Sequence, residues 1–272
     1  LDQDGIPAGA RNRRVSDTSV PLGAIAEYLD TYLRVRDVPD SDDAVNGLQV
    51  ENGGTVGRIV AAVDASLEAI ENAAPLASAE GTLLLVHHGL LWDGNVPLTG
   101  RRYRRVRALL DRNIALYSAH IPLDLHPDVG NNIVLARRLD VELEGWFGDY
   151  RGQRLGVYGE LALPRDELVR RIEAQLTASA RLIPGGPAAT HRVGIVTGSG
   201  GGFIAEALAT GIDTLITGEG AHHTYFDAME LGLNVIYAGH YATEQVGVQA
   251  LAQHLGLGFE LPWEFHRHPT GM

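Results

Sequence analysis

The sequence predicts an α/β protein of two intimately packed, duplicated lobes, and three observations lead to this fold class. Residues 110–124 and residues 230–244 follow one pattern, an apolar strand that ends in His-x-x-x-acid. The stretches before them, 58–89 and 192–220, share an order of strand, helix and strand. In both halves polar residues gather where the predicted strands end. Because ligands of such folds collect at strand ends, we expect the two halves to face each other across a site.

The elements of the first half follow from apolar spacing and turn residues. Residues 1–18 are polar without periodicity and predict a disordered tail. Residues 21–35 carry apolar side chains at helical spacing, and residues 83–86 are an apolar run suited to a central parallel strand. The same half is predicted to contain strands at 46–50, 58–64 and 114–118. Its further helices are expected at 66–74, after the loop 89–100 until about residue 111, and at 128–139.

The second half is built in the same way. Alternation over 141–163 predicts two strands, and residues 164–182 predict a helix with an acidic start. Residues 235–238 predict a short buried strand, and Gly239 lets the backbone turn at its end. The remaining predicted elements are strands at 193–196 and 214–217 and helices up to about 210, at 221–231 and at 245–255.

The composition limits the class of partner. The formal net charge is −12 with 22 Lys plus Arg residues, which disfavours a nucleic acid bound through its phosphates. No apolar run approaches the roughly 18 residues of a membrane helix, so no membrane partner is expected. No signal-peptide pattern is visible, and we expect a cytoplasmic protein. The absence of cysteine excludes disulfides, thiolate nucleophiles and thiolate metal sites.

Histidines gather with carboxylates at predicted strand ends or helix starts. The clusters are His87-His88, His120 with Asp124, His222-His223 and His240 with Glu244. A set of imidazoles and carboxylates suits Zn, Mn, Fe, Co or Ni better than Ca or Mg. Two such half-sites suit two divalent ions that share a carboxylate, so a dinuclear metal site between the strand ends is predicted. No nucleophile elbow is present, and water on a metal is the better candidate nucleophile.

Two further stretches permit more than one interpretation. The run 198–202 of mostly glycine lies between a strand and a helix, where it forms either a phosphate cradle or a tight packing turn. An arginine-rich stretch forms either the solvated face of a helix or an anchor for an anionic substrate or a subunit contact. Its members are Arg101, Arg102, Arg104, Arg105 and Arg107.

The motifs together resemble the Nif-three-like family, whose members are labelled GTP cyclohydrolase I type 2 homologues. The segments that carry the resemblance are 46–50 (NGLQV), 87–92 (HHGLLW), 120–124 (HIPLD) and 239–244 (GHYATE). It runs from about residue 19 to the C-terminal end and includes the Pro-Thr-Gly ending at 269–271. The resemblance implies two α/β lobes, a ring-shaped homohexamer and a dinuclear metal centre.

The resemblance also implies which residues hold the ions. The metal ligands of the family fall on His87, His88, Asp124, His240 and Glu244. In the pairing it suggests, Glu244 bridges both ions, His88 and Asp124 complete one site, and His87 and His240 complete the other.

Three more histidines are assigned roles next to the ligands. His120 matches a motif histidine that is not a primary ligand, and we expect it to support a ligand or to transfer a proton. His223 is a second candidate for proton transfer, and His222 and His223 are expected either to line the pocket or to lie on the surface. Gly89, Ile121 and Pro122 depart from the family pattern and are expected to alter the pocket wall only.

These assignments give a provisional domain division and function. The predicted metal-site lobe comprises residues 19–125 plus 235–272, and the second α/β lobe comprises residues 126–234. The leading hypothesis is a metal-dependent hydrolase that acts on a nucleotide or a related small molecule. The alternatives are a non-catalytic protein that stores or delivers metal, and an interaction scaffold with a structural metal pair.

Overall fold

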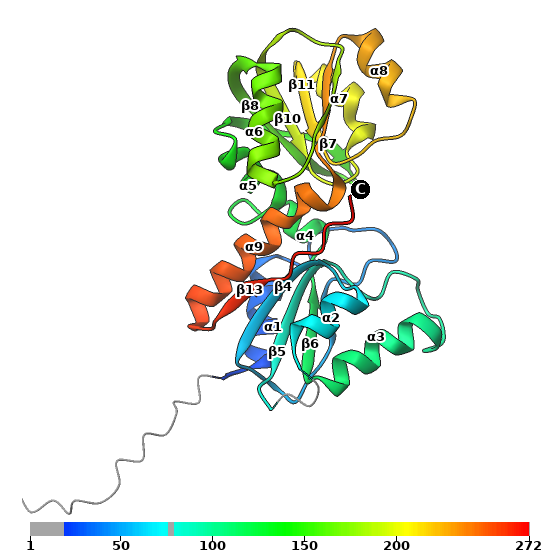
Figure 1. The fold of residues 1–272 in the computed structure, drawn as a ribbon, viewed down its shortest axis with the longest axis vertical. Helices are drawn as coiled ribbons and strands as arrows, with labels where there is room; N and C mark the ends of the chain where they lie inside the picture. Colours follow the sequence, from blue (N-terminus) through cyan, green and yellow to red (C-terminus); the bar gives the residue numbers. More distant parts are fainter. Residues whose placement is uncertain (1–18, 76–78, 272) are drawn as a thin grey trace, which may run out of the picture.

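The computed structural model describes residues 19–75 and 79–271, and the tail predicted to be disordered, 1–18, lies outside this range. The described chain is a mixed α/β protein with two large sheets, one at each end of an elongated body (Figure 1). Helix α9 runs between the two ends. Within the described residues no helix is long and apolar enough to cross a membrane.

The strands belong to one pair and two larger sheets. In chain order they are β1 (Val20–Pro21), β2 (Gly47–Val50), β3 (Thr55–Val56), β4 (Arg58–Asp64), β5 (Thr82–His88), β6 (Ile114–Ser118), β7 (Glu142–Tyr150), β8 (Gln153–Pro164), β9 (Arg181–Pro184), β10 (Ala189–Val196), β11 (Thr214–Thr217), β12 (Asn234–Tyr237) and β13 (Trp263–Phe265).

The helices cover both faces of the sheets (Figure 1). In chain order they are α1 (Leu22–Tyr32), α2 (Leu67–Ala73), α3 (Gly100–Asp111), α4 (Ile121–Asp124), α5 (Asn131–Arg138), α6 (Arg165–Leu176), the 3₁₀ turn η1 (Gly201–Phe203), α7 (Ile204–Ala209), α8 (Thr224–Leu231) and α9 (His240–Phe259).

The five-stranded sheet has the order β13-β4-β5-β6-β2, with β13, β4, β5 and β6 parallel. In this register Asp64 lies beside His88, and Val86 lies beside Ser118. The carboxyl ends of these strands therefore meet at one edge of the sheet. The centre of β5 is buried on both faces, which explains its continuous apolar run.

The six-stranded sheet has the order β7-β8-β10-β11-β12-β9, with β10, β11 and β12 parallel. Val196 lies beside Thr217, and Thr217 lies beside Tyr237, so these carboxyl ends also share an edge. In each sheet, therefore, three consecutive parallel strands deliver the chain into loops at one edge. The chain continues from β12 into α9 without a long loop, because only Ala238 and Gly239 separate them.

Helix α9 contributes to two hydrophobic cores. Val248 and Leu251 are buried in the core beneath the five-stranded sheet. Ala242 and Val246, nearer the start of the helix, are buried in a core of the six-stranded sheet. Because α9 is buried on so many sides, it has no exposed polar face in its first half, and it ties the two sheets together.

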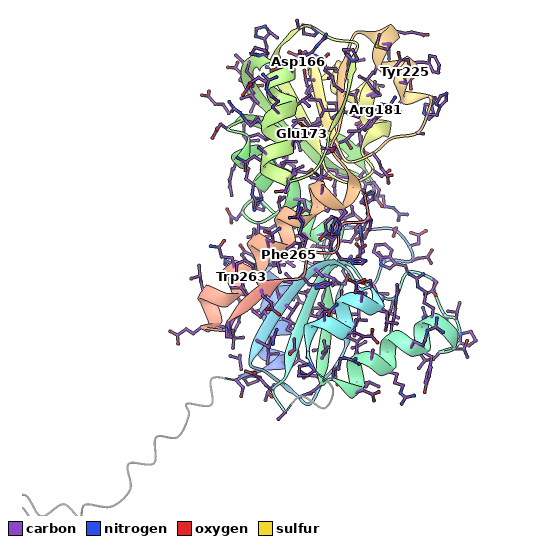
Figure 2. The ribbon with its side chains drawn as sticks, viewed as in Figure 1. Asp166, Glu173, Arg181, Tyr225, Trp263 and Phe265 are labelled. Carbon is purple, nitrogen blue, oxygen red and sulfur yellow. The ribbon has the colours of Figure 1, made fainter. Side chains whose placement is uncertain are left out.

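Several boundaries differ from those expected. The helix predicted over 164–182 is too long, because it ends at Leu176 and residues 181–184 pair with β12 as β9. The final helix begins at His240 rather than near 245, and β13 follows it. Figure 2 places Arg181 of β9 in the upper body and Trp263 and Phe265 of β13 in the lower body. The division predicted at residue 235 falls inside β12 and stays a prediction.

Candidate metal centre

Histidines from separate elements converge where the two sheets meet. His87 and His88 end β5, His120 precedes α4, and His240 begins α9. The ring centroids of His87 and His120 are 5.0 Å apart, and those of His88 and His240 are 5.4 Å apart. We call these side chains the four-histidine cluster. The structure therefore brings together residues that lie about half the chain apart in sequence.

Every ring of the four-histidine cluster is held by a hydrogen bond at Nδ1, and each partner is a carbonyl or a carboxylate. These bonds are His87 to Ala119 O (2.9 Å), His88 to Asp64 Oδ1 (2.8 Å), His120 to Asp40 Oδ1 (2.8 Å) and His240 to Glu219 Oε1 (2.7 Å). In a neutral imidazole, an acceptor at Nδ1 fixes the tautomer that carries its proton there and leaves Nε2 with a free lone pair. This is the arrangement that supporting groups impose on metal-ligating histidines.

The Nε2 atoms of His87, His88 and His240 surround the buried carboxylate of Glu244. Its Oε1 lies 3.5 Å from Nε2 of His87, and its Oε2 lies 3.3 Å from Nε2 of His88 and 3.1 Å from Nε2 of His240. A second buried carboxylate, Asp124, places Oδ2 at 3.6 Å from Nε2 of His87. Proximity thus pairs His88 with His240 and His87 with Asp124, which differs from the pairing that the family resemblance suggested.

Local backbone geometry places Glu244 at the centre. His240 and Glu244 are four residues apart, so both side chains lie on one face of α9. Gly198 approaches so closely that a Cβ added there would lie 2.1 Å from Oε1 of Glu244, and its φ is +66°. Only glycine meets both requirements without strain.

Asp124 is held by a buried amide. Asn131 donates from Nδ2 to Oδ1 of Asp124 at 2.8 Å, and its own Oδ1 accepts from the backbone N–H of Gly247 at 2.7 Å. The amide therefore links α4 and α5 to α9. It leaves Oδ2 of Asp124 directed at His87.

The arrangement fits divalent cations. Nε2 of His87 is buried and has no hydrogen-bond partner among the described residues, and Oε2 of Glu244 lacks a hydrogen bond of acceptable geometry. Buried polar atoms are rarely left in this state, because an unpaired group costs free energy. A proton or a cation between the imidazoles and the carboxylates removes that cost. Imidazole and carboxylate donors without thiolate suit Zn, Mn, Fe, Co or Ni.

Without a metal, two of these histidines, His87 and His240, hold protons tightly. Burial disfavours the charged form of His87, but the carboxylates of Asp124 and Glu244 outweigh it and raise its pKa to about 10. Contact with Glu244 raises the pKa of His240 to about 9. Burial opposes ionisation of Glu244, yet the facing histidines lower its pKa. Burial also raises the pKa of Asp124.

His120 forms a dyad with the buried carboxylate of Asp40. Burial opposes ionisation of Asp40, but hydrogen bonds from His120 and Asn46 keep its pKa below the usual value. Asn46 also accepts from the backbone N–H of His120 at 2.8 Å, so the imidazole is fixed at two points. The rings of His120 and Trp92 are nearly perpendicular, with centroids 4.8 Å apart. Such a dyad can accept or donate a proton beside the cluster.

Other predicted site residues lie elsewhere. His222 and His223 are exposed at the start of α8, and His223 has a side chain that is 73% exposed and lies 4.0 Å from Asp227. In the described part of the chain neither contacts the four-histidine cluster. The glycine run forms a packing turn: the backbone N–H groups of Gly198 and Gly200 donate to Thr243 and Thr217, so they are not available for a phosphate.

The supporting carboxylates were not among the predicted site residues. Asp64 stands at the end of a predicted strand, so its position could have suggested a role. Asp40 and Glu219 lie in loops whose paths the sequence does not specify. Only the folded chain shows that they reach the cluster.

With this geometry established, the chain can be placed in a class of proteins. The family described as Duf34/NIF3 (NGG1p interacting factor 3) matches residues 20–269. The chain belongs to this family, and the resemblance inferred from its motifs is confirmed.

Individual relatives extend over almost the whole chain. A Deinococcus radiodurans protein named GTP cyclohydrolase 1 type 2 homolog is 45% identical over 253 residues, which cover 91% of this chain and 93% of that protein. The solved structure of protein ybgI, of unknown function, has a TM-score of 0.84 at 35% identity and covers 93% of this chain and 100% of that one. A solved structure from Thermus thermophilus has a TM-score of 0.80 at 40% identity, with coverage of 93% and 100%.

Proposed function

We propose that this protein binds two divalent transition-metal ions and uses them as a hydrolase of a small molecule, such as a nucleotide. One observation carries the proposal: all four histidines are anchored at Nδ1, and the Nε2 atoms of His87, His88 and His240 face buried carboxylates. Neither a structural core nor a solvated surface requires such an arrangement. The name of the Deinococcus radiodurans relative motivates guanine nucleotides as the first compounds to test.

The proximities support a specific ligand assignment. His87 and Asp124 would hold one ion, and His88 and His240 would hold the other. Glu244 would bridge the two, because each of its oxygens faces a different set of imidazoles. The protein thus offers each ion about three ligand atoms, which leaves positions for water and substrate as in catalytic sites.

The proposed chemistry is hydrolytic. Bound divalent ions would polarise a substrate oxygen and lower the pKa of water to near neutrality. His120 would move the proton, because its hydrogen bond to Asp40 fixes the orientation of its ring. No step is assigned to His223, whose side chain is largely exposed. The homohexamer and the cytoplasmic location stay predictions.

Metal content tests the ligand assignment. Untagged protein purified without added metal or chelator is expected to contain about two ions per chain by elemental analysis. Glu244→Ala should lose both ions, whereas Glu230→Ala, an exposed change in α8, should keep them. Retention of two ions by Glu244→Ala would refute the bridging role.

Turnover tests the reaction. His120→Ala is expected to keep its metal and to lose hydrolysis of GTP or of another responsive substrate by about 100-fold or more. Loss of metal in this variant would instead make His120 a ligand, since His87, His88 and His120 also lie close enough to share an ion. If the fully loaded protein hydrolyses no phosphate ester, nucleotide or amide, the site stores or delivers metal and the hydrolase proposal fails.

A further inference from the structure

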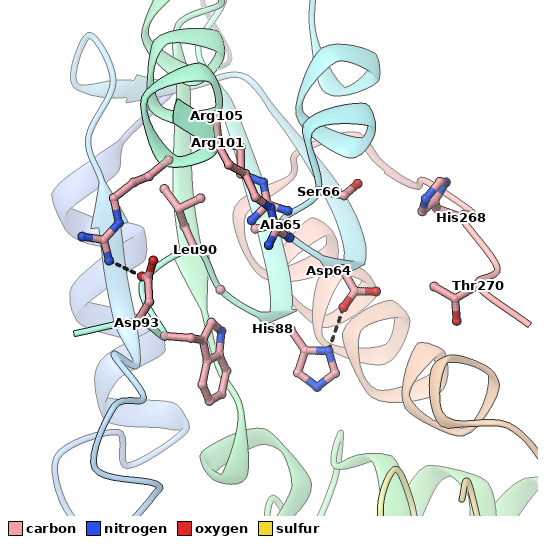
Figure 3. Close-up of a pocket in the computed structure, with 13 residues that line it drawn as sticks. Asp64, Ala65, Ser66, His88, Leu90, Asp93, Arg101, Arg105, His268 and Thr270 are labelled. Carbon is pink, nitrogen blue, oxygen red and sulfur yellow. Dashed lines mark hydrogen bonds and ion pairs between the residues drawn. The ribbon is translucent and has the colours of Figure 1, made fainter. Parts of the chain in front are cut away.

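A cavity of about 480 Å³ opens beside the four-histidine cluster. His88 forms part of its wall, together with Asp64, whose carboxylate holds the His88 ring. Arg101 and Arg105 of α3 enter it from one side, and the C-terminal segment that carries His268 closes the other (Figure 3). Its volume is in the range of sites for small organic ligands. One wall of the cavity is therefore a proposed metal ligand, and another is cationic.

The cationic wall has charge that the protein leaves unpaired. Arg101 and Arg105 are four residues apart on α3, so both project toward the same side. In the part of the chain that the structure describes, neither makes a hydrogen bond or an ion pair. Nε of the half-buried Arg105 is enclosed and has no partner. Burial, and then the charge of Arg101, lower the pKa of Arg105, so the two guanidinium groups repel each other.

The carboxylates of the cavity are already engaged. Asp64 accepts from His88, and Asp93 pairs with Arg102. They attract Arg105 from a distance without contacting it. The buried polar atoms of this wall that lack a partner among the described residues are N–H donors, on Trp92 and the arginines. The charge of Arg101 and Arg105 favours an anion as the ligand that accepts from such donors.

We propose that Arg101 and Arg105 form a subsite for the phosphoryl group of the substrate, and that the reacting part of the substrate extends from there toward His88. This inference rests on the proposed function, because it places the phosphoryl group relative to the same metal centre. It selects phosphorylated small molecules over neutral ones.

A phosphoryl group suits this pair better than a carboxylate. Each guanidinium is a planar fork of N–H donors that binds an oxyanion through two parallel hydrogen bonds. One carboxylate offers two oxygens and is satisfied by one fork. A phosphoryl group has three terminal oxygens and a charge near −2, so it engages both forks and offsets their repulsion.

Binding of inorganic phosphate to the full-length, metal-loaded protein tests the subsite. Calorimetry at fixed ionic strength is expected to give a phosphate affinity at least about tenfold lower in the Arg101→Ala/Arg105→Ala variant than in the wild type. Arg104→Ala is the matched control, since Arg104 lies on the same helix, is exposed and does not line the cavity. It should bind phosphate within about twofold of the wild type. Arg105→Lys, which retains the charge but not the fork, should be intermediate.

Two outcomes would overturn the subsite. One is phosphate binding that is absent in the wild type or equal in the double variant and the wild type, with thermal unfolding unchanged. The other is acetate displacing phosphate at equal concentration, which would make the subsite a carboxylate site.

The same series in the Glu244→Ala background separates this inference from the proposed function. If arginine-dependent phosphate binding persists there but the wild type holds no metal, the metal centre fails and the subsite stands. If the wild type holds two ions but phosphate binding does not depend on the arginines, the subsite alone fails.

Discussion

At the scale of single residues, the site depends on contacts too close for any larger side chain. Gly198 sits against Oε1 of Glu244 at a positive φ, and the added Cβ would come within 2.1 Å of that oxygen. The glycine therefore acts as a spacer that lets the carboxylate occupy the centre. Replacing it tests whether the position of Glu244, and not merely its charge, is needed for metal binding.

Gly198→Ala is expected to lose most of its metal while the protein stays folded. The positive φ costs roughly 1–2 kcal/mol in an alanine, and the methyl group would displace Glu244. Elemental analysis and circular dichroism measure the two effects. Gly202→Ala is the control, because a Cβ there meets nothing within 4 Å. Full metal content in Gly198→Ala would show that the loop shifts to accommodate the methyl group without displacing Glu244.

Metal binding is expected to strengthen as the pH rises. His87 and His240 have pKa values of about 10 and about 9 in the metal-free protein, so both carry a proton at pH 7 that a metal must displace. Affinity should fall by up to about tenfold per pH unit for each proton released as the pH decreases below 9. Calorimetry in two buffers of different ionisation enthalpy counts the protons. A metal affinity that does not change between pH 6 and pH 9 would contradict this linkage.

At the scale of elements, α9 and the strand ends assemble the site. Asn131 is the connection that sequence patterns do not reveal, since its amide joins Asp124 on α4 to the backbone of Gly247 on α9. It lies fully buried, and both of its hydrogen bonds are made inside the protein. The geometry at Asp124 thus depends on a residue that never meets a metal.

Asn131→Ala is expected to destabilise the metal-free protein by roughly 2 kcal/mol or more, because it removes two buried hydrogen bonds, to Asp124 and to Gly247. Urea unfolding measures the change. Asn72→Ala, an exposed substitution on α2, should change the free energy of unfolding by less than about 0.5 kcal/mol. Equal effects of the two substitutions would refute the role of Asn131 in holding the site together.

The more deeply an element is buried, the more accurately the sequence predicted it. Apolar runs such as those of β5 and β11 were located well, because a strand buried on both faces needs a continuous apolar sequence. Strand β9 was assigned to a helix, since its pairing with β12 depends on a partner some fifty residues away. The cluster histidines drew attention because they stand at strand ends, and their role as metal ligands stays a prediction. Asp40 and Glu219 were missed, because their loops show no apolar periodicity from which their paths could be predicted.

At the scale of the whole molecule, the candidate centre joins the two sheets. His87, His88 and Asp64 come from the five-stranded sheet, whereas Gly198 and Glu219 come from loops of the six-stranded sheet. Helix α9 belongs to both cores. A metal bound there would connect the two halves directly and should therefore raise the thermal stability of the whole chain.

Chelation is therefore expected to lower the thermal unfolding midpoint of the whole chain in one transition. A ligand that binds only the folded state at about 1,000 times its Kd stabilises that state by about 4 kcal/mol. Differential scanning calorimetry with and without chelator measures the shift, and re-addition of metal should reverse it. Glu244→Ala should show no response to chelator. A shift confined to one of two separate transitions would mean that the metal does not link the sheets.

The hydrogen bond between Asp64 and His88 has a consequence for communication between neighbouring sites. The Asp64 carboxylate holds the ring of a proposed metal ligand and also forms part of the cavity wall beside Arg105. The positive arginines partly offset the negative charge of Asp64. An anion that neutralises them strengthens the electrostatic effect of Asp64 on His88, whose Nε2 then binds a cation more tightly. Occupancy of the cavity and occupancy of the centre would thus favour each other by one shared factor, because binding linkage is reciprocal.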